Sequence, residues 1–293
     1  MLIKEIRGLR WSEIPSQSLD SCDDIRYAIG TEGCVNKFNH DMEDILYSNR
    51  SFPQGLTLIT PRVGEKIFSR FVQLVTRMCE NYAIEYIVVN DYGVLNALQL
   101  DDIKIVLGRT LIRSLAYAPW SSNLIRDESE QVKRNLLLPN IIHSSKMDFF
   151  KKYHIYAVEL CATPMLESAA TWLNKEGIKI FYHNDTTIAS IGRTCPYARL
   201  LHETASCCTY QCEDVLNINI CKIWSAKTCL YEDADGPTRE VVPKYLNIEN
   251  VLYYRTEDDT AINSDFDTIV FHSQFGNPFR KTQEAKLQTG ELL

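Results

Sequence analysis

Four cysteines lie within 18 positions of one another, in the segments Cys195-Pro-Tyr-Ala-Arg and Cys207-Cys208-Thr-Tyr-Gln-Cys212. Where thiols are kept reduced, clustered cysteines most often bind a metal. The spacing of 13 positions from Cys195 to Cys208, and of 4 from Cys208 to Cys212, is wider and less regular than the paired cysteines of a structural zinc site. It suits ligands that come from separate loops. Zinc and an iron–sulfur cluster both remain open on the residues alone.

The chain has ten cysteines, and most of the others are expected to be structural. Cys79 falls in a helix-like run and Cys161 ends an apolar run, so both are expected to pack as small hydrophobic side chains. Cys22, Cys221 and Cys229 are isolated and receive no role. Near the cysteine segments, Arg193 and Arg199 would offset the negative charge of metal-bound thiolates.

The elements that must position these residues alternate along the chain. Short runs rich in apolar and β-branched residues predict strands at 24–31, 56–60, 85–90, 103–107, 155–160 and 178–182. Between them, helical spacing or helix-end residues predict helices at 64–82, 93–98, 146–153 and 163–177. This alternation predicts an α/β fold with a parallel sheet. The number of strands, and the lack of a glycine-rich phosphate loop, favour a (β/α) TIM-like barrel, complete or distorted, over an open doubly wound sheet.

Beyond Cys212 the pattern changes to a β-rich segment. Val215–Trp224 alternates and predicts an exposed hairpin or a strand returning to the barrel, while Val251–Arg255 and Thr268–His272 predict two further strands. No repeat or linker divides the chain, so residues 1–293 are expected to form one domain with a loose tail from about residue 280.

Composition narrows the class of protein. The net charge is −7, which disfavours a broad nucleic-acid-binding surface. No apolar run is long enough to span a membrane, and the first residues lack the apolar core of a secretory signal. A cytoplasmic protein is therefore expected.

The cysteine segments resemble the collagenase-like peptidase family of unknown catalytic type, and within it the UbiU/UbiV-like branch. The likeness is carried by Gly192-Arg193-Thr194-Cys195-Pro196-Tyr197-Ala198-Arg199 with the following Cys208 and Cys212, and by Tyr27-Ala28-Ile29-Gly30-Thr31-Glu32-Gly33-Cys34. The resemblance implies a [4Fe-4S] cluster on Cys34, Cys195, Cys208 and Cys212. Cys207 is an extra thiol beside Cys208, so either could serve as the ligand, and Ser114–Leu138 is longer than the family pattern.

Strand ends supply the candidate pocket. Asn90-Asp91-Tyr92-Gly93-Val94, Leu107-Gly108-Arg109 and Val158-Glu159-Leu160 resemble strand ends of the same family. In a barrel the working pocket lies at the carboxyl ends of the strands. There, Asp91, Glu159 and His183 are candidates for proton transfer. Asn90, Arg109 and Arg193 are candidates for substrate binding, and the two arginines could each grip a carboxylate. Each of these residues could equally form a local structural contact.

The resemblance implies an oxygen-independent hydroxylation system. The chain would be the hydroxylase or a subunit of it, paired with a homologous UbiU-like subunit, acting on a small aromatic, quinone-like or specialised-metabolite substrate, with prephenate as oxygen donor. A non-catalytic iron–sulfur scaffold and a peptidase are the alternatives. Neither G-x-S-x-G nor H-E-x-x-H occurs, which disfavours the common hydrolase chemistries.

Overall fold

The computed structural model describes most of the N-terminal two thirds of the chain and parts of the remainder. The described residues are 2–15, 25–98, 102–115, 125–192, 195–200, 208–210, 212, 216–218, 245–249, 251–255 and 266–273.

Eight parallel strands close into a barrel, which confirms the predicted fold class. In barrel order the strands are β1, β12, β7, β6, β5, β4, β3 and β2. Their bounds are β1 Ile3–Arg7, β2 Ile25–Gly30, β3 Leu56–Thr60, β4 Ile84–Val89, β5 Lys104–Leu107, β6 Ile155–Cys161, β7 Lys179–His183 and β12 Thr268–His272. The N-terminal strand β1 pairs with β12 on one side and β2 on the other, so the two ends of the fold complete the ring together.

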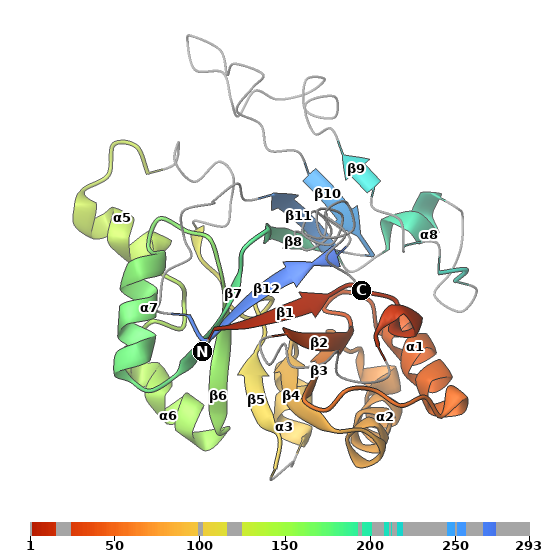
Figure 1. Cartoon of the computed structure of the whole chain (residues 1–293). Helices are drawn as coiled ribbons and strands as arrows, with labels where there is room; N and C mark the ends of the chain where they lie inside the picture. The colour runs from red at the N-terminus through yellow and green to blue at the C-terminus, as the bar shows by residue number, and fades with distance from the viewer. Residues whose placement is uncertain are drawn as a thin grey trace, which may run out of the picture.

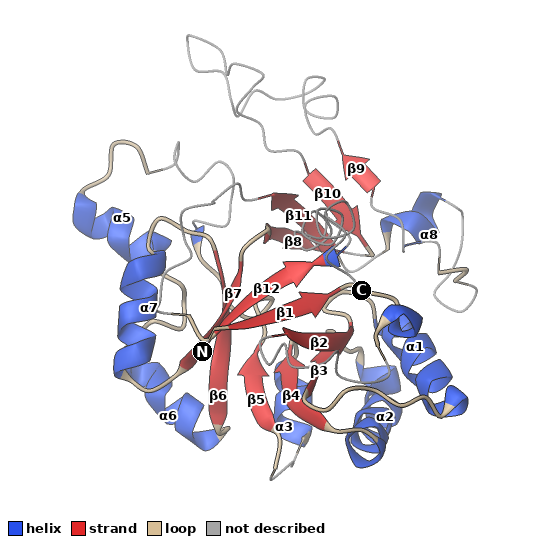
Figure 2. Cartoon of the chain, in the orientation of Figure 1, coloured by secondary structure: helices blue, strands red, loops and turns tan. Residues whose placement is uncertain are grey.

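Helices cover the outside of the barrel (Figure 2). They are α1 Val35–Ser48, α2 Phe68–Asn81, α3 Tyr92–Ala97, α5 Glu130–Leu137, α6 Met147–Lys152 and α7 Leu166–Lys175. In α2 the buried residues are Phe71, Leu74, Val75 and Met78, one face at helical spacing. Short 3-10 turns lie at Trp11–Glu13, Glu65–Ile67 and Ser144–Lys146.

Two predicted helices start later than expected, for local reasons. The predicted helix at 64–82 begins with the 3-10 turn Glu65–Ile67, and α2 starts only at Phe68. The predicted helix at 163–177 starts at Leu166, because the Thr163 hydroxyl accepts a hydrogen bond from the Met165 amide and holds a turn there. It ends before Gly177, whose φ of +75° suits a helix terminus.

The strands of a second sheet lie between β7 and β12 in the sequence, where a regular barrel would have a helix. Its order is β8 Thr186–Ile191, β11 Val251–Arg255, β10 Tyr245–Ile248 and β9 Leu216–Ile218, all antiparallel. Figure 1 shows this sheet beyond the ends of β1 and β12, with the short helix α8 Pro196–Leu200 beside it. The predicted β-rich C-terminal segment is thus confirmed.

The structure assigns the predicted C-terminal strands to different sheets. Val251–Arg255 lies in the second sheet, whereas Thr268–His272 is the last barrel strand. Within Val215–Trp224, the described residues Leu216–Ile218 pair with β10 and do not enter the barrel. The expected tail from about residue 280 lies outside the described residues. No helix in the described ranges has the length and apolar character to cross a bilayer.

Candidate functional site

The four predicted metal ligands gather at one place. Cys34 follows β2 and stands at the N-terminus of α1, and Cys195 lies between β8 and α8. Burial, together with the nearby Glu249 and Cys195, raises the pKa of Cys34 to about 11, although hydrogen bonds from the Lys37 and Asn36 amides lower it in part. The pKa of Cys212 is raised by burial, by Glu249, and by Cys34, Cys195 and Cys208. Cys34, Cys195 and Cys208 therefore lie close enough to Cys212 to raise its pKa.

The candidate donor set consists of thiols from three separate segments of the chain, at Cys34, at Cys195, and at Cys208 and Cys212. Within the described ranges, no three His, Cys, Asp or Glu side chains converge tightly enough to hold a single metal ion. In a [4Fe-4S] cluster each cysteine binds a different iron, so the ligand sulfur atoms lie farther apart than the ligands of a single metal ion. Cys207 lies outside the described residues, so the choice between it and Cys208 stays a prediction.

Glu249 is a member of this site that the sequence did not reveal. It lies just after β10, and its carboxylate accepts hydrogen bonds from the Cys34 amide at 2.7 Å and the Thr31 hydroxyl at 2.5 Å. Its backbone carbonyl lies 3.9 Å from the Cys195 sulfur. Burial raises the pKa of Glu249 to about 7, although the Thr31 and Cys34 hydrogen bonds lower it in part. Glu249 thus fastens the second sheet to the helix that carries Cys34.

Arg109, predicted to bind substrate, is committed to the fold. It is 2% exposed, and its guanidinium forms two hydrogen bonds to Glu32, at 2.9 Å from Nε and 2.5 Å from Nη2. A third bond goes to the Thr186 carbonyl at 2.9 Å, and the Tyr253 hydroxyl donates to Glu32 at 2.7 Å. Arg109 and Glu32 therefore clamp the barrel to both β8 and β11.

Glu159 and His183 lie together at the carboxyl ends of β6 and β7. Glu159 is fully buried, accepts from the Arg109 amide at 2.9 Å, and pairs with Arg7 at 2.5 Å. Its Oε2 is 3.4 Å from His183 Nε2. Burial lowers the pKa of His183 well below its usual value, and the positive charges of Arg109 and Arg7 lower it further, so the imidazole is neutral. Neither ring nitrogen of His183 forms a hydrogen bond within the described structure.

The charged layer continues into the barrel. Glu5 is fully buried and accepts hydrogen bonds from Arg7, Arg26 and Thr57, each at 2.7 Å. Burial opposes ionisation of Glu5, but the two arginines outweigh it and the pKa of Glu5 is lowered. An ionic network from three neighbouring strands therefore fills part of the interior that aliphatic layers usually fill in such barrels.

Asn90 and Asp91 serve local structure. The Asn90 side-chain oxygen accepts from the Thr110 hydroxyl at 2.7 Å and packs on Gly108, where a Cβ would come within 2.1 Å of it. The Asp91 carboxylate caps α3 by accepting from the Gly93 amide at 2.7 Å. Arg193, the remaining predicted substrate ligand, lies outside the described residues.

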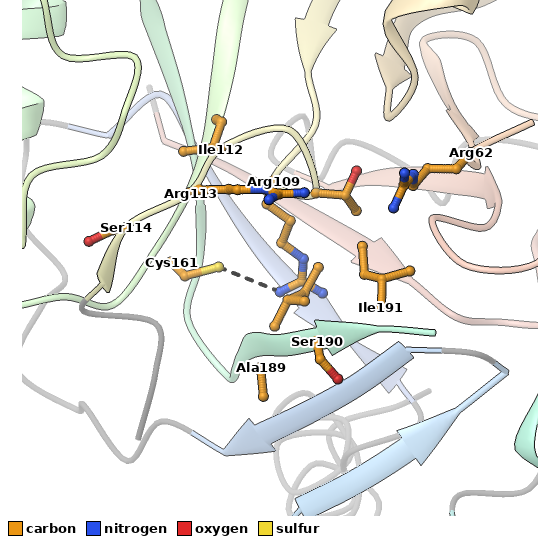
Figure 3. Close-up of a pocket in the computed structure, with 11 residues that line it drawn as sticks. Arg62, Arg109, Ile112, Arg113, Ser114, Cys161, Ala189, Ser190 and Ile191 are labelled. Carbon is orange, nitrogen blue, oxygen red and sulfur yellow. Dashed lines mark hydrogen bonds between the residues drawn. The ribbon is translucent and has the colours of Figure 1, made fainter. Parts of the chain in front are cut away.

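A pocket of about 330 Å³ opens beside Arg109. Its walls come from the loops after β3 and β5, from Cys161 at the end of β6, and from β8 (Figure 3). Arg62 and Arg113 were not foreseen as pocket residues, because exposed arginines in loops carry no distinguishing pattern. Arg109 links the pocket wall to the segment that carries Cys34, since its partner Glu32 lies two residues before Cys34 in the sequence.

Comparison of the chain with family models, with curated proteins and with solved structures finds no significant match. The resemblance to the UbiU/UbiV-like branch therefore stays a prediction that depends on the quoted residues.

Proposed function

We propose that this chain is an iron–sulfur protein of an oxygen-independent hydroxylation system. The single observation that carries the proposal is the meeting of Cys34, Cys195, Cys208 and Cys212 at the barrel mouth, although Cys34 lies 161 to 178 positions before the others in the sequence. The family resemblance depends on sequence register alone, so the meeting of these four residues in the fold supports it independently. A barrel core alone gives no reason for thiols from such distant segments to meet.

The site fits a [4Fe-4S] cluster in its chemistry. Four thiols would hold it, and Glu249, on the second sheet, would support the loop that presents Cys34. Burial, the nearby Glu249 and the neighbouring cysteines raise the pKa of Cys34 and Cys212, and the positive charge of bound iron would offset this rise by stabilising the thiolates. When bound, the cluster would supply one-electron chemistry at the barrel mouth.

The pocket and two buried side chains would supply the other functions that a hydroxylase needs. The pocket of about 330 Å³ would take a small aromatic, quinone-like or specialised-metabolite substrate, with prephenate as oxygen donor, and a homologous UbiU-like subunit as partner. Glu159 and His183 are the proposed proton-transfer pair, since they lie 3.4 Å apart and His183 is held neutral. Asp91 is less suited to this role, because it caps α3. Reduced thiols at the site fit a cytoplasmic protein.

One observation favours a second candidate, a non-catalytic iron–sulfur scaffold. Glu159 and His183 are fully buried, and neither is among the residues that line the pocket. Arg109 and Asp91 are also engaged in structural contacts. In this case the partner subunit would carry the chemistry. A peptidase is disfavoured at the pocket cysteine, because Cys161 is 1% exposed and burial raises its pKa.

Two experiments test these proposals. Cys195→Ala should lose the cluster after anaerobic reconstitution, whereas Cys79→Ala on α2 should keep it, and far-UV circular dichroism would show that both variants are folded. Iron retained in Cys195→Ala would remove this residue from the ligand set. The cluster-loaded protein, purified with its partner subunit, should then add one oxygen atom to a quinone precursor only when prephenate is present, as read by mass spectrometry. If the partner subunit alone forms the product, this chain is the non-catalytic scaffold. If the chain releases peptides from a protein substrate, the peptidase assignment is favoured instead.

A further inference from the structure

The ring of Tyr210 packs on the ring of His40 in α1, with the ring centroids 4.3 Å apart and the planes tilted by 42°. Tyr210 lies between Cys208 and Cys212 in the sequence, and α1 begins directly after Cys34. The ring contact therefore joins the two segments of the chain that carry three of the four candidate ligands. Burial raises the pKa of the Tyr210 hydroxyl, and Cys208 and Cys34 raise it further, so the side chain lies near both thiols.

The backbone of Tyr210 has a conformation that favours other residue types. Its φ is +57°, in the left-handed region that glycine and asparagine adopt far more readily than a bulky aromatic residue does. Such an exception is a reason to look for a functional contact. Asparagine would form the turn more easily, so the aromatic ring at this position is explained by its contact with α1.

The ring of His40 is itself held in place. Its Nδ1 lies 3.3 Å from Asp41 Oδ1, and the Lys37 ammonium donates to both oxygens of the Asp41 carboxylate at 2.7 Å. Lys37 and Asp41 are about one turn apart on α1, the spacing at which charged pairs meet on a helix. The side chain that Tyr210 contacts is therefore fixed to the first half of the helix that follows Cys34.

Glu249 fastens two of the candidate ligands from the side of the second sheet. It accepts a hydrogen bond from the Cys34 amide, and its carbonyl lies 3.9 Å from the Cys195 sulfur. The other two candidate ligands lie on the loop that contains Tyr210, which contacts α1. The two sets of contacts meet at Cys34, because this residue is the N-cap of α1.

We propose that Tyr210 and His40 are positioning residues of the cysteine site. Their ring contact holds the loop that carries Cys208 and Cys212 against Cys34, so that the thiols converge before any metal binds. The proposal rests on the proposed function, because it treats these thiols as one ligand set. Tyr210→Asn keeps the turn and removes the ring, whereas Tyr210→Phe keeps the ring, so the two variants separate a positioning role from a turn.

A measurement without the cluster tests the convergence of the thiols directly. The reduced, metal-free full chain is treated with dibromobimane, which becomes fluorescent when it bridges two thiols. Peptide mapping by mass spectrometry then reads the bridges from Cys34 to Cys208 or Cys212. These bridges should form in the parent and in Tyr210→Phe, and should fall severalfold in Tyr210→Asn and His40→Ala. Tyr47→Ala, on the same helix at a residue that is 93% exposed, should bridge as the parent does.

The same variants are then compared after anaerobic reconstitution. Tyr210→Asn and His40→Ala should lose iron to a chelator about tenfold or more faster than the parent, since residues that orient ligands typically contribute this much. The double variant should lose iron no faster than either single variant, because both changes remove one contact. Tyr210→Phe and His40→Phe should retain iron as the parent does, and urea unfolding should show that all the variants are folded.

Bridging and iron retention like those of the parent in Tyr210→Asn would overturn the proposal and leave Tyr210 as a turn residue. Tyr210→Phe and His40→Phe variants as defective as Tyr210→Asn would also overturn it, because the ring contact would then not position the thiols. A parent that binds no iron, but forms the Cys34 bridges only when the ring at position 210 is present, would refute the cluster proposal alone.

Discussion

Replacing Glu32 by Gln tests whether Arg109 is held by the protein and is thus unavailable to substrate. Gln keeps the size of the side chain and an oxygen that can accept from Tyr253 and Arg109, so the change removes the charge alone. Glu32 is 6% exposed and Arg109 is 2% exposed, so the arginine would then be a buried cation with its partner charge gone. The Thr186 carbonyl would still accept its hydrogen bond from the Arg109 guanidinium.

The magnitude follows from the carboxyl group itself. Burial alone would raise the pKa of Glu32, but Arg109 outweighs it and lowers the pKa from 4.5 to about 2. At about 1.4 kcal/mol per pKa unit, this favours the folded, ionised state by roughly 3 kcal/mol. Breaking a buried pair by removing one partner typically costs about 3–5 kcal/mol, which agrees. We therefore expect Glu32→Gln to lower the free energy of unfolding by about 3 kcal/mol.

Urea unfolding at neutral pH, followed by far-UV circular dichroism, measures this loss. Glu43→Gln is the matched control, because Glu43 forms an exposed pair with Arg70 at 2.6 Å and should cost less than about 1 kcal/mol. A second variant, Glu32→Gln with Arg109→Met, should recover part of the loss because the stranded cation is gone. If Glu32→Gln costs no more than Glu43→Gln, Arg109 is not clamped and its assignment to substrate binding returns.

Two further predictions concern stability. Burial opposes ionisation of Asp185, but the ring of His272, 2.9 Å away, outweighs burial and lowers the pKa of Asp185 from 3.8 to about 2. Because the pKa is lower in the folded state than in the unfolded state, the ionised carboxylate stabilises the fold by about 2 kcal/mol. This stabilisation is complete above pH 3.8 and is lost as the pH falls toward 2. The unfolding free energies of the parent and Asp185→Asn should therefore differ at pH 5 and converge near pH 2, and a constant difference would refute the assignment. Gly30→Ala should cost at least about 3 kcal/mol in urea unfolding, because φ is +91° and a Cβ would meet the Ile59 carbonyl oxygen at 2.2 Å. Gly64→Ala, with open space around the Cβ, should stay within about 1 kcal/mol, and equal losses in the two variants would contradict this account.

Sequence periodicity predicted the elements whose buried face is apolar. Strand β3 was predicted with its observed bounds, because all five of its residues are buried and all five are apolar or β-branched. Strand β1 was not predicted, since Glu5 and Arg7 turn inward to form ion pairs and make a buried strand look polar. Strand β8, with three threonine or serine residues, gave no alternation either. A strand whose buried residues are charged or polar is therefore not recognised from its hydrophobicity pattern.

The candidate site divides in the same way. The cysteines were found because thiols are rare and their register is specific, and Cys34 needed the family resemblance. Glu249 was missed because its role depends on a turn that places it against α1, more than 200 positions away. Arg62 and Arg113 were missed because only the closed barrel brings their loops to one pocket. Long-range assembly, and not residue type, defines these positions.

The most direct test of the central claim is iron and acid-labile sulfide analysis of the anaerobically purified protein, joined to EPR after dithionite reduction. We predict about four iron and about four sulfide per chain with the EPR signal of a reduced [4Fe-4S] cluster, all lost in Cys34→Ala as in Cys195→Ala. A colourless protein that carries one zinc and no sulfide would contradict the account.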